Sequence, residues 1–173
     1  NGGVAQWSSV EYVQTNLDDK FMARDSYGGS QVVRYKQAAP TDKITEVRVA
    51  HDDDNVYFYV KCKTSLSSFK GKDNWLNIFI GTGEPEAKGW ESYEYVIGRQ
   101  PEAETLSVES LEADFSSNEI GQAAITKVAN MIQISVPRAL MKLDGESGFY
   151  FKVTMGVEDM SNIMNRYNTG SSL

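Results

Sequence analysis

The sequence predicts an all-β fold, a two-sheet antiparallel β-sandwich, and three observations lead to this prediction. Most apolar segments alternate apolar and polar residues with a period of two, as strands with one buried side do. The segments between them are rich in Asp, Asn, Gly, Ser and Pro. Helical signals are scarce, and only PRALMKL (137–143) has a proline at a suitable first helical position. Many short strands with at most one or two short helices are typical of immunoglobulin-like or jelly-roll-like sandwiches.

The clearest strand is NVYFYVKCK (55–63), in which Val56, Phe58, Val60 and Cys62 form one face. The other predicted strands are 31–36, 44–50, 74–80, 92–98, 105–111, 123–129, 131–137 and 149–157. Strict alternation in 74–80 places Trp75, Asn77 and Phe79 on one side, and apolar residues on both sides predict burial on both faces. The short connections HDDDN (51–55) and VANM (128–131) predict hairpins. The first thirty residues are the least regular and are expected to wrap the edge of the sandwich.

Length and charge limit the classes of partner. With 173 residues and 40% hydrophobic content, we expect residues 1–173 to form one domain, and we expect a monomer. The formal net charge is −7 and no basic cluster is present, which argues against nucleic acid and anionic membrane surfaces. No apolar run is long enough to cross a bilayer, so membrane insertion is not expected. Cys62 is the single cysteine, which excludes an internal disulfide. Its place in a predicted strand favours a role as a small buried hydrophobic side chain.

The loop GTGEPEAKG (81–89) superficially resembles a phosphate-binding turn. A phosphate loop needs a helix after it, but the following residues WESYEYVI are strand-like, and Glu84 and Glu86 would repel phosphate. These two glutamates, with the Thr82 hydroxyl, form a weak calcium candidate. An ordinary solvated hairpin loop is the preferred interpretation. We therefore expect no cofactor, with calcium left open.

Enzymatic machinery is poorly supported, so the sequence predicts a protein that is not an enzyme. His51 is the only histidine, and any Ser-His-Asp or Cys-His system would have to use it. It lies at a strand end beside three aspartates, where a surface hydrogen bond or a turn cap explains it. No G-x-S-x-G motif accompanies it. A pair of carboxylates for glycoside hydrolysis stays open, because Asp and Glu are abundant.

Aromatic residues around the 81–89 loop carry the remaining signal. Flat rings suit the apolar faces of sugars, and neighbouring amide, guanidinium and carboxylate groups bind hydroxyls. The alternative is that such residues pack in the core or across strands. The candidate carbohydrate contacts are Trp75, Asn77, Trp90, Tyr93, Tyr95 and Arg99.

A run of segments resembles a known superfamily. VRVAHDDDNVYFYVKC, DNWLNIFIGTG, GWESYEYVIGR, ISVPRALMKL and FYFKV follow one another in the chain. This order resembles the carbohydrate-binding module family 9 and DOMON-like β-sandwich domains, in which V-x-Y-D-D-x-x-L-Y-V precedes D-S-V-E-I-F-I-D. More closely, the chain from about residue 25 to 173 is similar to domains appended to secreted glycan-degrading proteins of gut Bacteroidetes. Asn77 stands where the family has a sugar-contacting glutamate.

The resemblance implies a non-catalytic module that binds or positions carbohydrate. It implies a secreted, periplasmic or cell-surface location and an accessory role as the C-terminal part of a larger protein, such as a glycoside hydrolase. The alternative is an interaction domain that packs on a catalytic neighbour without binding sugar. That alternative is favoured because no tryptophan follows Trp90, so the family's second clamping tryptophan is missing.

A further alternative is a haem-binding DOMON-like domain, in which Met and His serve as axial ligands. Here the histidine would be His51, and the candidate methionines are Met131, Met155, Met160 and Met164.

Overall fold

Strands dominate the part of the chain that the computed structural model describes, which confirms the all-β prediction. This part comprises residues 4–11, 13–15, 24–27, 34–37, 43–66, 68–83, 89–143 and 148–155, with the backbone alone at 24–27 and 34–37. The elements are η1 (Val4–Ser9), β1 (Val13–Thr15), β2 (Arg24–Tyr27), β3 (Arg34–Gln37), β4 (Ile44–His51), β5 (Asn55–Cys62), β6 (Leu76–Gly81), β7 (Tyr95–Pro101), β8 (Thr105–Leu111), β9 (Ser117–Val128), β10 (Met131–Pro137), η2 (Arg138–Met141) and β11 (Tyr150–Met155). Both η elements are short 3-10 helices, and η2 confirms the helical turn predicted after Pro137.

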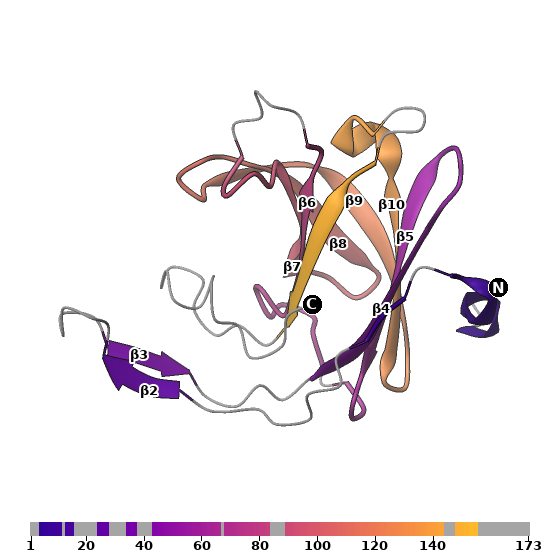
Figure 1. Cartoon of the computed structure of the whole chain (residues 1–173), viewed down its shortest axis with the longest axis horizontal. Coiled ribbons are helices and arrows are strands. Elements are labelled where there is room, and N and C mark those ends of the chain that lie inside the picture. The colour runs from indigo at the N-terminus through magenta and orange to yellow at the C-terminus, as the bar shows by residue number, and fades with distance from the viewer. Residues whose placement is uncertain are drawn as a thin grey trace.

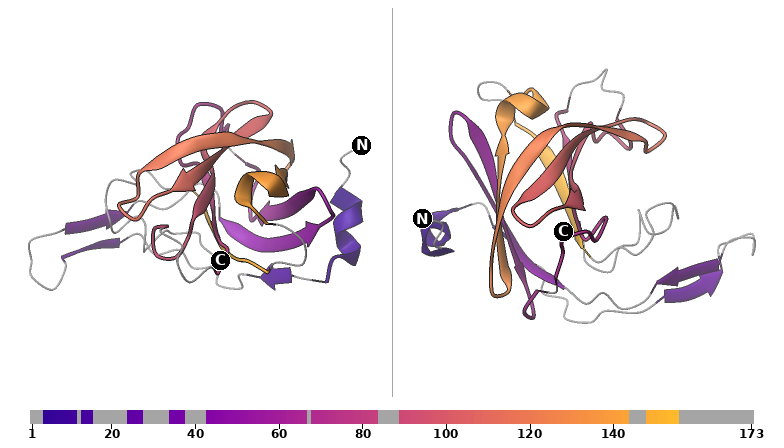
Figure 2. Two further views of the ribbon diagram at one scale, coloured as in Figure 1. Left: turned by 90° about the horizontal axis from the view of Figure 1, so that it is seen from above. Right: turned by 180° about the vertical axis from the view of Figure 1, so that it is seen from behind.

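Nine strands form one continuous antiparallel sheet in the order β1-β4-β5-β10-β9-β8-β7-β6-β11. The sheet curls, so that the half with β4, β5 and β10 faces the half with β6 and β11 (Figure 1). β9 joins the two halves, because its residues 117–124 pair with β8 and its residues 124–128 pair with β10. β2 and β3 form a separate two-stranded sheet, drawn apart from the large one in both views of Figure 2.

Most predicted strands are confirmed, and their boundaries differ for identifiable reasons. β9 begins six residues before the predicted start at 123, because pairing with β8 extends the strand over SNEIGQ. The sequence did not predict this part, since these residues are mostly polar and show no buried side. β6 begins only at Leu76, because Asn74 takes a left-handed conformation with φ 58°. β7 begins at Tyr95, because Glu91 and Ser92 have positive φ in the tight turn that pairs Trp90 with Tyr93.

The predicted hairpins at 51–55 and 128–131 are both present. His51 pairs with Val56 across the first turn, and Val128 pairs with Met131 across the second. The described N-terminal residues also contain elements that the sequence did not predict, namely η1, β1 and β2. β1 pairs with β4 at one edge of the sheet, whereas β2 belongs to the separate two-stranded sheet. The expectation that the first thirty residues wrap the edge of a sandwich stays a prediction.

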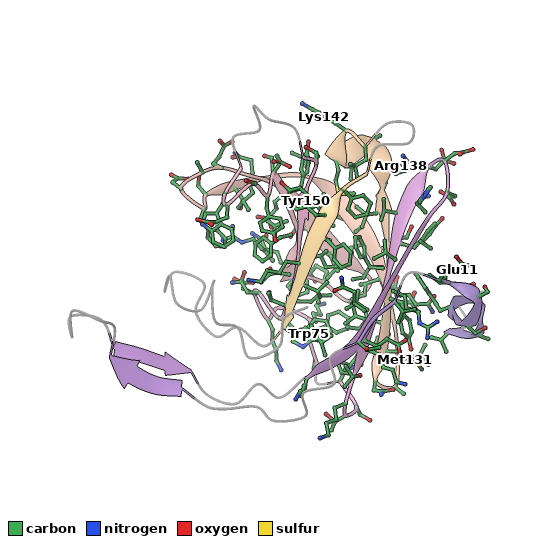
Figure 3. The ribbon with its side chains drawn as sticks, viewed as in Figure 1. Glu11, Trp75, Met131, Arg138, Lys142 and Tyr150 are labelled. Carbon is green, nitrogen blue, oxygen red and sulfur yellow. The ribbon has the colours of Figure 1, made fainter. Side chains whose placement is uncertain are left out.

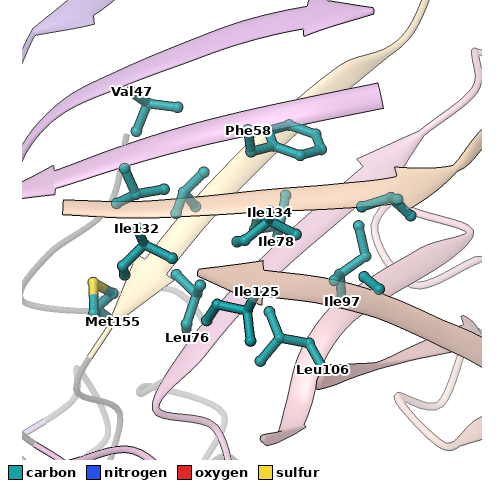
Figure 4. Packing of buried hydrophobic residues seen from close by; sticks show 14 of the residues in the cluster. Val47, Phe58, Leu76, Ile78, Ile97, Leu106, Ile125, Ile132, Ile134 and Met155 are labelled. Atoms are coloured by element: carbon teal, nitrogen blue, oxygen red, sulfur yellow. The ribbon is translucent and has the colours of Figure 1, made fainter. Parts of the chain in front are cut away.

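The main hydrophobic core fills the space inside the curl (Figure 4). Inward residues of β4 to β11 meet there, among them Ile78, Ile97, Ile132 and Val153. Phe58 of β5 is fully buried, and its ring lies 5.7 Å from that of Phe151 on β11. The two halves of the sheet are therefore held together by apolar side chains that point toward each other.

A second apolar cluster lies on the outer face of β6, β7 and β8. It contains Phe79, Trp90, Val96, Leu111 and Phe115, with Tyr93 packed against them. Leu76, Ile78 and Ile80 alternate with Phe79 along β6 and point into the main core instead. All six residues of β6 are buried, which confirms the prediction of a strand covered on both faces.

Candidate functional site

A cleft of about 500 Å³ lies against the outer side of β4, β5, β10 and β9. It is lined by Gln6, Trp7, Val10, Ala50, His51, Tyr57, Ala124, Thr126, Gln133, Ile134 and Ser135. Figure 1 shows η1 beside β4, outside the curl of the sheet. The cleft is therefore bounded by the sheet on one side and by residues of η1 on the other.

The floor of the cleft follows from strand register. Ala50, Tyr57, Ser135 and Ala124 lie directly opposite one another across β4, β5, β10 and β9. Neighbouring strands are about 4.8 Å apart, so these four residues form a continuous row. Three of the four side chains are small, and Ala124 is exposed. The row therefore leaves a hollow beside the Tyr57 ring.

Trp7 forms the wall of the cleft on the η1 side. Its ring is 4% exposed and lies 5.5 Å from the ring of Tyr59. Arg48 Nη1 donates to the Trp7 carbonyl oxygen at 2.7 Å, and Arg48 Nε donates to Glu46 Oε1 at 2.7 Å. The tilted packing of the Trp7 ring on Tyr59 and the hydrogen bonds of Arg48 together fix η1 on the sheet.

The Gln133 amide is oriented by two donors from η1. Trp7 Nε1 donates to Gln133 Oε1 at 2.9 Å, and Gln6 Nε2 donates to the same oxygen at 3.1 Å. An amide oxygen has two lone pairs, so both are in use here. Further hydrogen bonding by this amide must come from its NH₂ group, as a donor.

Tyr57 is held at the rim of the cleft by the β4–β5 turn. Its hydroxyl donates to Asp52 Oδ2 at 2.6 Å, while Asp52 Oδ1 accepts from the backbone N–H groups of Asn55 and Asp54 at 2.7 and 3.0 Å. The hydrogen bond from Tyr57 is the largest cause that lowers the pKa of Asp52 below 3.8. The same bond raises the pKa of Tyr57 above 10.0.

Removing the Tyr57 hydroxyl tests this arrangement. In Tyr57→Phe we expect the pKa of Asp52 to rise toward 3.8, because the largest cause of its depression is gone. Since the folded pKa is lowered, Asp52 adds stability above pH 3.8 that is lost as pH falls through the folded pKa, and the variant should lose part of this dependence. Carbon-13 NMR titration of the carboxyl groups measures the change.

Asp114 is the internal control for this titration, because its pKa is lowered by a hydrogen bond from Ser116 instead. The pKa of Asp114 should be the same in both proteins. An unchanged pKa of Asp52 in the variant would contradict the Tyr57–Asp52 contact.

Two of the six candidate carbohydrate contacts lie in the main core. Trp75 stacks on Phe69 with ring centroids 4.7 Å apart, and Tyr95 belongs to the same buried cluster (Figure 3 labels Trp75). The prediction that Trp75 shares a side with Asn77 and Phe79 is wrong, because the left-handed Asn74 places Trp75 outside the alternation of β6.

The other four candidates are Asn77, Trp90, Tyr93 and Arg99. Trp90 belongs to the second apolar cluster, on the outer face of β6, β7 and β8 (the outer-face cluster), and Tyr93 packs against it. The Arg99 guanidinium lies 4.9 Å from the centre of the Phe115 ring in the same cluster. Trp90 is 7% exposed and packs edge-on against Phe115 at 4.9 Å. The rings of this cluster therefore cover one another's faces. A role for these residues as carbohydrate contacts stays a prediction.

The outer-face cluster borders a buried polar group. Glu109 accepts hydrogen bonds from Ser107, at 2.6 Å, and from Ser117. Arg99 Nη1 donates to Ser117 Oγ at 2.8 Å. Arg99 is thus engaged by its own neighbours, which accounts for its position without a ligand.

Asn77 is fully buried on β6, opposite Thr154 of β11. Within the described residues, neither its amide group nor the Thr154 hydroxyl has a hydrogen-bond partner. Burial of unpaired polar groups costs stability. Because Asn77 is fully buried, its amide group is not accessible to a ligand from solvent in this arrangement.

The candidate metal and haem ligands do not come together in the described part. No group of three or more His, Cys, Asp or Glu side chains is placed there to hold a metal, and Glu84 and Glu86 lie outside the described residues. His51 lines the cleft outside the sheet, whereas Met155 is buried in the main core next to Cys62. Met160 and Met164 also lie outside the described residues.

His51 and Ser135 both line the cleft, but no hydrogen bond joins them, as a base and a nucleophilic hydroxyl would require.

Among the described helices, neither has the length and apolar character needed to span a membrane.

Comparison with known proteins adds no assignment. No family model matches the chain, and no curated protein matches it.

The sequence-based candidates did not include the cleft as a site. Tyr57 and Gln133 were visible on the polar sides of their strands, and Ala124 is a small residue at an exposed strand position. Trp7 could not be connected with them, because it lies 126 residues before Gln133 in a segment without strand periodicity.

Proposed function

We propose that the protein is a non-catalytic carbohydrate-binding module and that the cleft beside η1 is its sugar site. The observation that carries this proposal is the row in which Ala50 lies on one side of Tyr57, and Ser135 and Ala124 lie on the other, with Trp7 in the wall of the cleft. A pyranose ring has apolar C–H faces and a rim of hydroxyl groups. Small floor residues let such a ring approach the sheet, and the partly exposed ring of Tyr57 can contact its apolar face, whereas Trp7, which is 4% exposed, closes the wall of the cleft.

Size and polarity support the same proposal. The volume of about 500 Å³ falls within the range of small-molecule sites. Gln6, Thr126 and Gln133 provide neutral hydrogen-bonding groups around the floor. A mostly apolar hollow with a few oriented polar groups is what binding one or two sugar units requires.

We also propose that the curled sheet is a variant of the two-layer β-sandwich expected from the sequence. Its two halves enclose one main core, and β9 serves as the strand that passes from one layer to the other. With the family 9-like and DOMON-like resemblance, this supports an accessory domain of a secreted glycan-processing enzyme.

The second candidate function is an interaction domain that binds no sugar. The packing of Trp75, Tyr95 and Trp90 favours it, because three of the predicted contacts serve the protein's own cores. On this alternative the cleft receives a side chain of a neighbouring domain.

Substitution of Ala124, at the β9 end of the floor, gives the sharpest test. Ala124→Leu should fill the hollow while keeping the fold, because Ala124 is exposed and leucine is tolerated on a strand surface. Measured by affinity gel electrophoresis against neutral polysaccharides, the affinity should fall at least about tenfold, or about 1.4 kcal/mol. The bound polysaccharide should release no new reducing ends.

Gln122→Leu is the matched control, because Gln122 is an exposed residue of the same strand that does not line the cleft. It should bind as the unmodified protein does. If the polysaccharide gel retards Ala124→Leu as strongly as the unmodified protein, the cleft is excluded as the sugar site. If Tyr93→Ala is no longer retarded, the sugar site lies at the outer-face cluster instead. Absence of retention on every glycan would favour the interaction domain.

A further inference from the structure

We infer that the cleft selects uncharged sugar rings and rejects glycans that carry carboxylate or sulfate groups. This inference rests on the proposed carbohydrate site and names the class of sugar that it takes. It follows from the charges in and around the cleft and from the polarity of its hydrogen-bonding groups.

Among the described residues, the lining offers no lysine or arginine as a counter-ion for an acidic sugar. Among the described residues that line the cleft, none is Asp, Glu, Lys or Arg. A carboxylate that leaves water for such a site loses its hydration and gains no cation in exchange. An uncharged hydroxyl loses far less, because neutral amide and hydroxyl groups replace its water contacts.

Two arginines on neighbouring elements are already engaged. Arg48 donates to Glu46 and to the Trp7 carbonyl, behind the wall of the cleft. Arg138 is largely buried and donates to the carbonyl oxygens of Asp52 and Leu143. Neither guanidinium group lines the cleft.

The rim adds negative charge. Asp52, Asp53 and Asp54 are exposed in the turn that follows His51, and Tyr57 at the rim is bonded to Asp52. At physiological salt their field extends about 8 Å, which is enough to reach a ligand beside Tyr57. The net charge of −7 acts in the same direction.

Hydrogen-bond polarity also suits hydroxyl groups. Both lone pairs of the Gln133 oxygen are used by Gln6 and Trp7, so this oxygen has none left to accept a hydrogen bond from a ligand. The Tyr57 hydroxyl donates its hydrogen bond to Asp52, so its oxygen contacts a ligand as an acceptor. A sugar hydroxyl can donate to the Tyr57 oxygen, whereas a carboxylate can only accept.

The test compares polymers that differ only in charge. Polygalacturonate, alginate and hyaluronan are each titrated beside their carboxyl-reduced forms, together with neutral glucan, mannan, xylan and galactan. We expect binding to at least one neutral or reduced polymer, at least about tenfold tighter than to any acidic form. Binding should change little between 20 and 500 mM NaCl, roughly the range over which screening removes charge effects.

A charge-insertion pair strengthens the test. Thr126 is exposed and lines the cleft, so Thr126→Lys places a cation there and Thr126→Gln places a neutral side chain of similar reach. The lysine variant should gain retention on an acidic polymer, and salt should remove that gain. The glutamine variant should show no gain.

The outcomes separate the two proposals. Tighter binding of an acidic polymer than of its reduced form would overturn the selectivity while leaving the carbohydrate site in place. No gain on acidic polymers from Thr126→Lys would also count against the charge argument. Binding to none of the polymers, charged or neutral, would overturn the proposed function and the selectivity with it.

Discussion

Phe58→Ala is expected to lower the free energy of unfolding by about 3–5 kcal/mol. The Phe58 ring is fully buried and makes edge contacts with Phe151 and Phe149, at centroid distances of 5.7 and 6.3 Å. These contacts join β5 to β11, which belong to opposite halves of the curled sheet. Alanine would remove the ring and leave a cavity where the halves meet. Urea unfolding followed by tryptophan fluorescence measures the loss.

Phe58→Leu is the control, because it keeps an apolar side chain of intermediate size. Its loss should be clearly smaller, about 1–2 kcal/mol. A loss below about 1 kcal/mol for the alanine variant would mean that Phe58 does not join the two halves.

Gly98→Ala is expected to cost about 2–4 kcal/mol. Gly98 has φ +95°, a conformation that L side chains rarely adopt. An added Cβ would lie 2.4 Å from the carbonyl oxygen of Leu76, a backbone atom of the neighbouring strand that cannot rotate away. The glycine also lies where the pairing of β7 with β8 shifts register, between Ile97 and Pro101. Thermal and urea unfolding should both report the loss.

Gly148→Ala is the matched control, because an added Cβ there would meet no atom within 4 Å. Its effect should stay within about 0.5 kcal/mol. Equal stabilities of the two variants would contradict the close approach of β6 and β7 at Gly98.

The sequence was sufficient to predict strands whose alternation is regular. β5 has one fully apolar side, formed by Val56, Phe58, Val60 and Cys62, so its limits follow from the residues themselves. The first half of β9 was missed because its residues are polar on both sides and are held only by pairing with β8. The single curled sheet was not predicted either, because the change of partner along β9 depends on residues far away in the chain.

The candidate site was only partly predictable. Trp90 and Tyr93 come together because they flank one tight turn, which is a local feature. Trp75 was assigned to the wrong side because one left-handed residue, Asn74, ends the alternation that the prediction assumed. The cleft depends on the contact between Trp7 and Gln133, and no local pattern encodes a contact over such a separation.

If the cleft holds a polymer, as proposed, the position of Ala124 in the sheet has a mechanical consequence. Ala124 is opposite Ser135 of β10 on one flank and opposite Thr105 of β8 on the other. A chain anchored above this residue pulls on a strand with neighbours on both sides, so the load is shared between them. An edge strand such as β11, with one neighbour in the sheet, would provide a weaker anchorage.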